Sequence, residues 1–128
     1  MEIVTNYPLK KHNTFGISTN AKEFVQVHTT QELAQVLKEN EGKKLFILGG
    51  GSNMLLTEDI DALVIHVDLK GRQILSTDNG HADVKAMAGE NWHEFVQYCI
   101  SQNLGGLENL SLIPGNVGTT PIQNIGAY

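Results

Sequence analysis

The chain has 128 residues, 41% of them hydrophobic and 18% charged, which suits a single packed domain. Nine basic residues against 14 acidic ones give a net charge of −5, which argues against a nucleic-acid or anionic-membrane partner. The longest apolar runs, such as residues 45–48 and 63–67, are too short to cross a bilayer, and residues 1–6 lack the features of a signal peptide. The single cysteine suits a reducing compartment, so we expect a cytoplasmic protein.

The first predicted elements are a strand and a helix. Residues 23–28 alternate as a β-strand does, and Thr29 with Glu32 predicts a capping box at the start of a helix. Gly42 is expected to end this helix as its C′ residue. The predicted buried stripe of the helix consists of Leu33, Val36 and Leu37.

Two further strands follow. Residues 44–48 predict a buried strand that runs directly into a glycine-rich turn, and residues 63–67 predict another strand. The pattern so far is β–α–β. Near residues 68–72 it gives way to a hairpin pattern, so we expect the boundary between two lobes there.

The second half begins with a predicted hairpin. Ile74-Leu75 and residues 84–88 flank Asp78-Asn79-Gly80, the strongest short hairpin signal in the chain. Asn91 with Glu94 then predicts the capped start of a second helix, which Gly105-Gly106 is expected to stop. The predicted apolar stripe of this helix consists of Phe95, Val96, Cys99 and Ile100.

The first motif with chemical meaning is Leu48-Gly-Gly-Gly-Ser-Asn53, called the glycine turn below. Successive N–H groups after a strand can form a nest for a phosphate or diphosphate, and Ser52 adds a hydroxyl donor. No Gly-Lys-Ser/Thr follows, and Met54 stands at the third glycine position of a Rossmann fingerprint. A tight turn that needs φ > 0 explains the glycines equally well.

The second motif is the terminal segment, residues 112–128, in which Gly115, Gly118 and Gly126 permit close backbone approach. Its composition predicts an irregular loop, and its uncharged polar side chains suit a large neutral ring such as a flavin. The alternative is a structural loop that packs on the second helix. Because proteins rarely end on such a loop, we expect the chain to be the front part of a longer protein.

Other residues give weaker signals. The five histidines show no metal-ligand spacing, so no metal site is predicted. His93 is expected at a solvated helix position, Trp92 in packing, and Cys99 as a buried, unreactive thiol. No carboxylate pair or Ser/His/Asp arrangement indicates a catalytic site.

Five blocks of the chain form a pattern when they are taken together and in order. They are Asn13-Thr-Phe-Gly-Ile17, the glycine turn, Ala88-Gly-Glu-Asn-Trp-His93, Gly106-Leu-Glu-Asn-Leu110 and the terminal segment. In this order and spacing they resemble the UDP-N-acetylenolpyruvoylglucosamine reductase (MurB) family of bacterial cell-wall synthesis. The ending Pro-Ile-Gln-Asn-Ile-Gly-Ala-Tyr is similar to the type I subgroup of that family.

The resemblance implies an α+β chain with the bipartite FAD-binding fold of the vanillyl-alcohol-oxidase (PCMH-type) kind. Residues 1–70 would form a small α/β first lobe, and residues 71–128 the start of a truncated α+β second lobe. The resemblance also implies which residues contact FAD. Those expected at the diphosphate are Gly49, Gly50, Gly51, Ser52, Asn53 and Met54. Those expected along the flavin are Ile113, Pro114, Gly115, Gly118, Thr119, Thr120, Gln123, Asn124, Gly126 and Ala127.

In the family, NADPH reduces FAD, and the reduced flavin then reduces the enolpyruvyl group of a UDP-sugar. A serine, an arginine and a glutamate complete that chemistry, and the resemblance implies that all of them lie beyond Tyr128. The chain alone is therefore expected to show no turnover and to self-associate through its incomplete second lobe. Two alternatives remain at this stage: a free-standing flavin or nucleotide-binding module, and the front of another FAD oxidase or dehydrogenase of the same fold.

Overall fold

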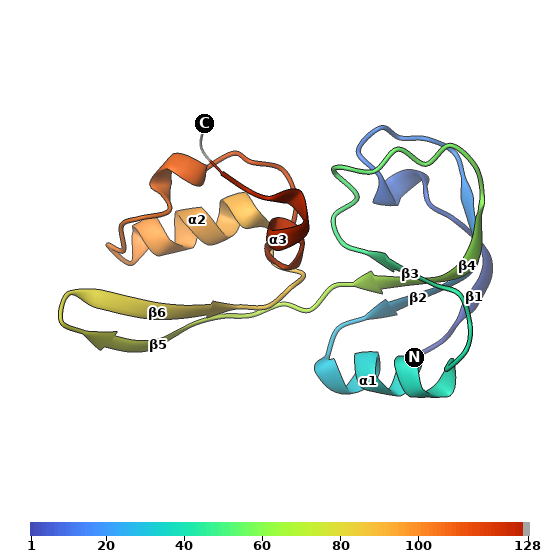
Figure 1. Cartoon of the computed structure of the whole chain (residues 1–128), viewed down its shortest axis with the longest axis horizontal. Coiled ribbons are helices and arrows are strands. Elements are labelled where there is room, and N and C mark those ends of the chain that lie inside the picture. The colour runs from blue at the N-terminus through green and yellow to red at the C-terminus, as the bar shows by residue number, and fades with distance from the viewer. Residues whose placement is uncertain (127–128) are drawn as a thin grey trace. The chain divides into compact units, whose positions relative to one another are not determined.

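The computed structural model describes residues 1–126, in which helices and strands are mixed (Figure 1). The chain divides into two compact units, Met1–Leu69 and Lys70–Tyr128. Among residues 1–126, no helix combines the length and the apolar character needed to cross a membrane.

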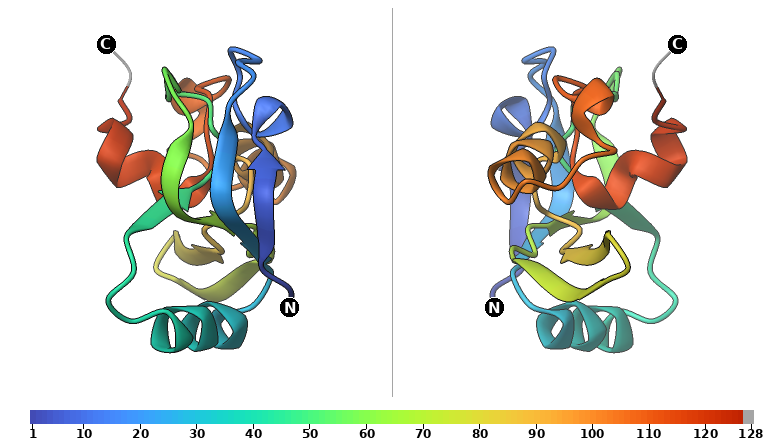
Figure 2. Two further views of the ribbon diagram at one scale, coloured as in Figure 1. Left: turned by 90° about the vertical axis from the view of Figure 1, so that its right-hand side faces the viewer. Right: turned by 90° about the vertical axis from the view of Figure 1, so that its left-hand side faces the viewer.

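The first unit is built on a four-stranded mixed sheet with the strand order β1-β2-β4-β3 (Figures 1 and 2). Strand β2 pairs antiparallel with β1 and parallel with β4, and β3 pairs parallel with β4. Because helix α1 connects β2 to β3, the expected β–α–β unit is present. The elements are β1 (Val4–Pro8), η1 (Lys10–His12), β2 (Asn20–Val27), α1 (Thr30–Glu39), β3 (Leu45–Leu48) and β4 (Ile60–Val67).

The two central strands supply the core of this unit. Phe24 of β2 and Val64 of β4 are paired neighbours in one apolar cluster with Leu9, Leu48 and Leu56. Residues that alternate with these along β2 and β4 are buried on the opposite face, where α1 packs on β2. The fully buried side chains of this unit outside the cluster are Val25, Val27, Val36, Leu63 and Ile65.

Helix α1 begins as predicted but ends differently. The Thr29 hydroxyl accepts from the N–H of Glu32, and the Glu32 carboxylate accepts from the N–H of Thr29, so the capping box is confirmed. The helix ends at Asn40, whose N–H and Nδ2 both donate to the carbonyl of Val36. The prediction for Gly42 was wrong because the Asn40 side chain ends the helix, and Gly42 takes its φ of +85° in the turn that follows.

Strand β3 is less buried than predicted. Leu48 is buried, whereas Leu45 and Ile47 are 36% and 57% exposed. The reason is its position at the edge of the sheet, where only β4 pairs with it. The helix stripe is also narrower than predicted, since only Val36 is buried and Leu37 is 39% exposed.

The second unit begins with the predicted hairpin, formed by β5 (Arg72–Asp78) and β6 (His81–Ala86). Asn79 and Gly80 occupy the turn with φ of +48° and +77°. Positive φ at both central residues is the signature of a type I′ turn, which Asn-Gly favours. Strand β6 ends at Ala86, two residues before the predicted end.

Helix α2 (Trp92–Ser101) is capped by Asn91, whose side chain accepts from the N–H of Glu94. It ends earlier than predicted. Asn103 adopts a φ of +58°, and the N–H of Leu104 donates to the carbonyl of Cys99. Asparagine tolerates this left-handed conformation, so the helix stops before Gly105-Gly106 is reached.

The core of the second unit is small. It consists of Trp92, Phe95, Val96 and Cys99 of α2, packed against partly buried residues of β6 and of the chain after α2. Ile100 is 43% exposed and lies outside it, in contrast to the prediction. The remaining elements are η2 (Glu108–Leu110), η3 (Val117–Thr119) and α3 (Thr120–Gln123).

Candidate functional site

The glycine turn leaves the sheet of the first unit at the end of β3. Gly50 and Asn53 are exposed, whereas Gly51 is buried. Within residues 1–126, the N–H groups of residues 50–53 donate no hydrogen bond. The turn therefore has the unengaged backbone donors that an anion nest requires.

Gly51 has a separate, structural role. Its φ is +64°, and a Cβ on it would lie 1.9 Å from the carbonyl oxygen of His12. Its own carbonyl accepts from the N–H of Thr14 at 3.1 Å. The positive-φ explanation of the motif thus applies to Gly51, and it is compatible with ligand binding by its neighbours.

Asn13 holds the segment against which Gly51 packs. Its Nδ2 donates to the carbonyls of Leu9 and Ile17 at 2.9 and 3.1 Å, and its Oδ1 accepts from the N–H of Ile17 at 2.9 Å. The side chain is buried and closes the turn of residues 13–17 beside the glycine turn. In the sequence, Asn13 stands out only as part of a family block, and no local pattern indicates this role.

The terminal segment lies in the second unit and is more regular than predicted, because η3 and α3 fall within it. Gly115 is buried, Pro114 and Asn124 are exposed, and Ile113 is partly buried. Ala127, also predicted to contact the flavin, lies outside the described residues. The two predicted groups of FAD ligands belong to different units.

Backbone hydrogen bonds join the terminal segment to residues 88–92. The carbonyl of Gly115 accepts from the N–H of Trp92 at 3.0 Å. The N–H of Val117 donates to Glu90 at 2.8 Å, and that of Gly118 donates to Ala88 at 2.9 Å. The segment therefore runs along residues 88–92, which we call the rail.

The glycines of the terminal segment permit close contacts inside the protein. A Cβ on Gly118 would lie 2.7 Å from the Cβ of Ala88 on the rail, and one on Gly115 would lie 2.7 Å from Oε1 of Gln123. The N–H of Gly118 is already used at the rail. The lack of a side chain at these two glycines is therefore explained by contacts within the protein, as expected for a structural loop. Contact between the segment and a flavin remains a prediction.

The polar side chains of the segment also divide into two kinds. The Thr119 hydroxyl lies 2.8 Å from the carbonyl of Asn116, and the Thr120 hydroxyl lies 2.8 Å from that of Val117. Gln123 Oε1 lies 3.2 Å from the Thr119 hydroxyl. By contrast, the exposed Asn124 side chain makes no hydrogen bond within the described part of the chain, so it is available to a ligand.

His93 is not the solvated residue that was predicted. Its Nδ1 accepts from the N–H of Leu112 at 3.1 Å and lies 2.9 Å from the Ser111 hydroxyl. Leu112 has a φ of +66°, so this bond holds a strained backbone at the start of the terminal segment. Trp92 is a packing residue as predicted, and its Nε1 donates to the carbonyl of Leu110 at 2.8 Å.

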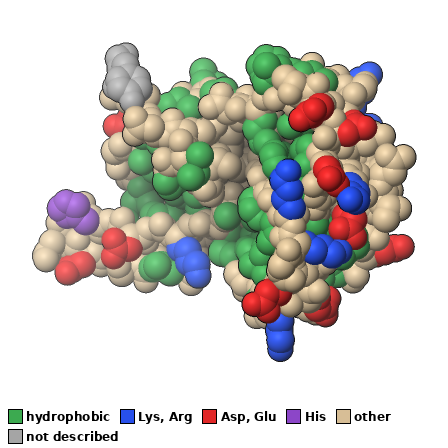
Figure 3. Space-filling view, turned by 45° about the vertical axis from the view of Figure 1, so that its right-hand side comes forward, with side chains coloured by type: hydrophobic (Ala, Val, Ile, Leu, Met, Phe, Trp, Pro, Cys, Tyr) green, Lys and Arg blue, Asp and Glu red, His purple; other side chains and the backbone are tan. Residues whose placement is uncertain are grey.

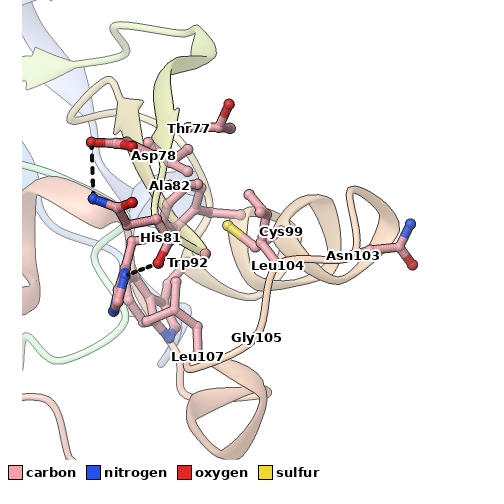
Figure 4. A pocket seen from close by; sticks show the side chains of 14 residues that line it. Thr77, Asp78, His81, Ala82, Trp92, Cys99, Asn103, Leu104, Gly105 and Leu107 are labelled. Carbon is pink, nitrogen blue, oxygen red and sulfur yellow. Dashed lines mark hydrogen bonds between the residues drawn. The ribbon is translucent and has the colours of Figure 1, made fainter.

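A groove lies between the hairpin and the C-terminal end of α2 (Figure 4). Its walls come from the hairpin tip on one side and from Phe95, Cys99 and Leu107 on the other. Among residues 1–126, none of the predicted FAD ligands lines it. Burial raises the pKa of the Cys99 thiol, which agrees with the predicted unreactive cysteine.

On the face of the first unit in Figure 3, acidic and basic side chains are interspersed, and Lys22–Asp61 and Lys43–Glu23 form ion pairs. In residues 1–126, no group of three or more His, Cys, Asp or Glu side chains is placed to hold a metal ion. Burial lowers the pKa of His12, which contacts the rings of Tyr7, Phe24 and His66.

The family model described as "FAD binding domain" matches residues 21–128. The chain therefore belongs to the FAD binding domain family, whose cofactor is FAD. Its α+β structure agrees with the predicted fold class.

The chain is also similar to curated proteins named UDP-N-acetylenolpyruvoylglucosamine reductase. The protein from Flavobacterium johnsoniae is 63% identical over 128 residues, which are 100% of this chain and 38% of that protein. The protein from Pseudomonas putida is 52% identical over 122 residues, which are 94% of this chain and 36% of that protein. The chain thus spans somewhat over one third of the length of these relatives.

The chain is also similar to a solved structure of a protein with this kind of name. The crystal structure of UDP-N-acetylenolpyruvylglucosamine reductase (MurB) from Thermus caldophilus matches with a TM-score of 0.65 and 29% identity. The match covers 93% of this chain and 40% of that one. The resemblance described from the sequence is thereby confirmed.

Proposed function

We propose that this chain is the FAD-binding part of an NADPH-dependent reductase that converts UDP-N-acetylglucosamine enolpyruvate to UDP-N-acetylmuramate in peptidoglycan synthesis. The 63% identity to the Flavobacterium johnsoniae reductase over the whole chain supports the assignment. The observation that carries the binding role is the glycine turn, whose amides at residues 50–53 are unengaged within the described residues.

These amides fit a diphosphate. Backbone N–H groups that point into a concavity bind phosphate oxygens without a charged side chain, and the acidic chain provides few cations for the task. Ser52 is partly exposed and its hydroxyl makes no hydrogen bond within residues 1–126, so it can add a donor. The glycine turn and Met54 would therefore hold the diphosphate half of FAD.

The terminal segment would contact the flavin half. Its backbone is fixed by the rail, and the Asn124 amide, which makes no side-chain hydrogen bond within residues 1–126, can pair with the polar edge of a flavin ring. Bound FAD supplies hydride transfer, which no side chain can perform. The contribution of the chain is to bind the cofactor, orient its ring and limit the access of water.

The co-substrate, the substrate, the cellular location and self-association are also part of the proposal. We also propose NADPH as co-substrate, a UDP-sugar substrate and a cytoplasmic location. The similarity to proteins named UDP-N-acetylenolpyruvoylglucosamine reductase supports the UDP-sugar substrate. Self-association through the second unit is supported by its two-stranded sheet and by Leu75, which is 58% exposed. Sedimentation of the purified chain checks this last part, and a monomer at all concentrations would contradict it.

The diphosphate role is tested by Gly50→Val. The position is exposed, so a β-branched side chain should cover the nest without disturbing the core of the first unit. We expect the dissociation constant for FAD to rise at least about tenfold, because amide–phosphate hydrogen bonds are lost. Quenching of flavin fluorescence measures binding, and far-UV circular dichroism checks the fold.

Gly105→Val is the matched control for this variant. Gly105 has no positive φ, and a Cβ on it would meet only Glu108 oxygens at 3.9 and 4.0 Å. The Gly105→Val variant should bind FAD with the same dissociation constant as the unmodified chain. If Gly50→Val retains the affinity of the control, the glycine turn is only a structural turn.

A further inference from the structure

The rail is fixed at its centre by a buried carboxylate. Glu90 is 6% exposed, although acidic side chains are rarely buried without partners. Its Oε1 accepts from the N–H of Gly71 at 2.6 Å, and its Oε2 lies 3.5 Å from Nε of Arg72. The carboxylate thus ties the rail to the segment that enters β5.

Neighbouring contacts reinforce the same junction. Gly71 has a φ of +140°, and its carbonyl accepts from the N–H of Met87 just before the rail. The Lys70 ammonium donates to the carbonyl of Gly89. Residues 70–72 therefore contact the rail through both backbone and side-chain groups, with the Glu90 carboxylate as the buried acceptor.

The other side of Glu90 faces the terminal segment. Its backbone carbonyl accepts from the N–H of Val117 at 2.8 Å. Gly118 and Gly115 bond to the rail residues on either side, Ala88 and Trp92. One residue therefore joins the entrance of β5, through its side chain, to the middle of the predicted flavin contact, through its backbone.

We infer that Glu90 is a positioning residue for flavin binding: it fixes the rail and, through it, the path of residues 115–118. The inference rests on the proposed function for the ligand, but the positioning itself is a property of the chain. Without the carboxylate, the Gly71 N–H and the Arg72 guanidinium lose a buried acceptor, and the rail loses its anchor. The glycine turn lies in the other unit.

The test compares Glu90→Ala and Glu90→Gln in the 128-residue chain. The glutamine keeps an oxygen for the Gly71 N–H but gives up the charge beside Arg72, so its effect should be the smaller one. Glu94→Gln is the matched control, since Glu94 is an exposed carboxylate in the first turn of α2. The first readout is amide hydrogen exchange without any ligand. Exchange at Val117 and Gly118 should accelerate in Glu90→Ala, remain slow in the control, and stay unchanged in β2 and β4.

The second readout separates the two halves of the cofactor. FAD and ADP are titrated in parallel by calorimetry, because ADP contains the diphosphate but no flavin. For Glu90→Ala we expect the dissociation constant for FAD to rise about tenfold, as for the loss of a buried acceptor, while that for ADP is unchanged. Unchanged exchange at Val117 and Gly118, or an equal loss of FAD and ADP affinity, would overturn the inference. If the unmodified chain binds neither nucleotide, the proposed function fails, and hydrogen exchange still decides whether Glu90 positions the segment.

Discussion

Gly51→Ala should destabilise the first unit by about 4 kcal/mol, the sum of roughly 1–3 kcal/mol for overpacking and a similar cost for a strained backbone. The added Cβ would lie 1.9 Å from the carbonyl oxygen of His12, 2.9 Å from its carbon and 3.1 Å from the Cα of Asn13. All three are backbone atoms, and the Asn13 side chain holds that backbone through three hydrogen bonds. No rotation of a side chain can relieve the contact. Urea denaturation followed by circular dichroism measures the loss.

Gly16→Ala is a closely matched control. Gly16 has the same φ of +64°, but a Cβ there would meet nothing within 4 Å. This variant should cost only the conformational strain, about 2 kcal/mol. If the two alanine variants were equally stable, the contact between Gly51 and His12 would not be important for the fold.

Phe95→Ala should unfold the second unit. In the part of this unit that the structure describes, four side chains form the buried cluster, and Phe95 is 7% exposed with its ring centroid 5.7 Å from that of Trp92. Truncating a buried phenylalanine lowers the free energy of unfolding by about 3–5 kcal/mol, which is as much as a core of this size contributes. Because Trp92 is the only tryptophan, its fluorescence reports on this core directly. A red-shifted emission under native conditions is the expected result.

Ile100→Ala provides the comparison on the same helix. Ile100 is 43% exposed and lies outside the buried cluster, so its truncation should cost about 1 kcal/mol or less and leave the Trp92 emission unchanged. Hydrogen exchange in β2 and β4 should stay slow in both variants, since these strands belong to the first unit. A native emission spectrum for Phe95→Ala would show that the second unit does not depend on this cluster.

Features determined by a few neighbouring residues were predictable from the sequence. The Thr29 capping box, the Asn91 cap and the Asn79-Gly80 turn each depend on backbone groups within three residues. The two helix ends were misplaced because asparagine did what glycine was expected to do. Asn40 caps α1 with its side chain, and Asn103 takes the left-handed conformation after α2.

Features that depend on distant segments were not predictable in the same way. Strand β1 has almost no buried residue and so no apolar pattern to detect. The exposure of β3 follows from its place at the sheet edge, which its own composition does not indicate. The contact of Gly51 with His12, and the burial of Glu90 against residues 70–72, join parts of the chain that are 18 or more residues apart.

The candidate site shows the same division. The glycines of the terminal segment indicated close approach, but not whether a ligand or the protein approaches. At Gly115 and Gly118 the neighbours are Gln123 and Ala88. His93 was predicted to be solvated because the helix pattern does not reveal the strained backbone of Leu112, whose N–H donates to the His93 ring. A strained residue of this kind is recognised only once the backbone is known.

We propose that this chain binds FAD through the glycine turn and the terminal segment. The most direct test is to titrate the ¹⁵N-labelled chain with FAD and follow its amide resonances. We expect the largest shifts at residues 49–54, with a second group at residues 113–126, and shifts from ADP confined to the first group. Absence of any shift at residues 49–54, or shifts confined to the groove between the hairpin and α2, would contradict the account.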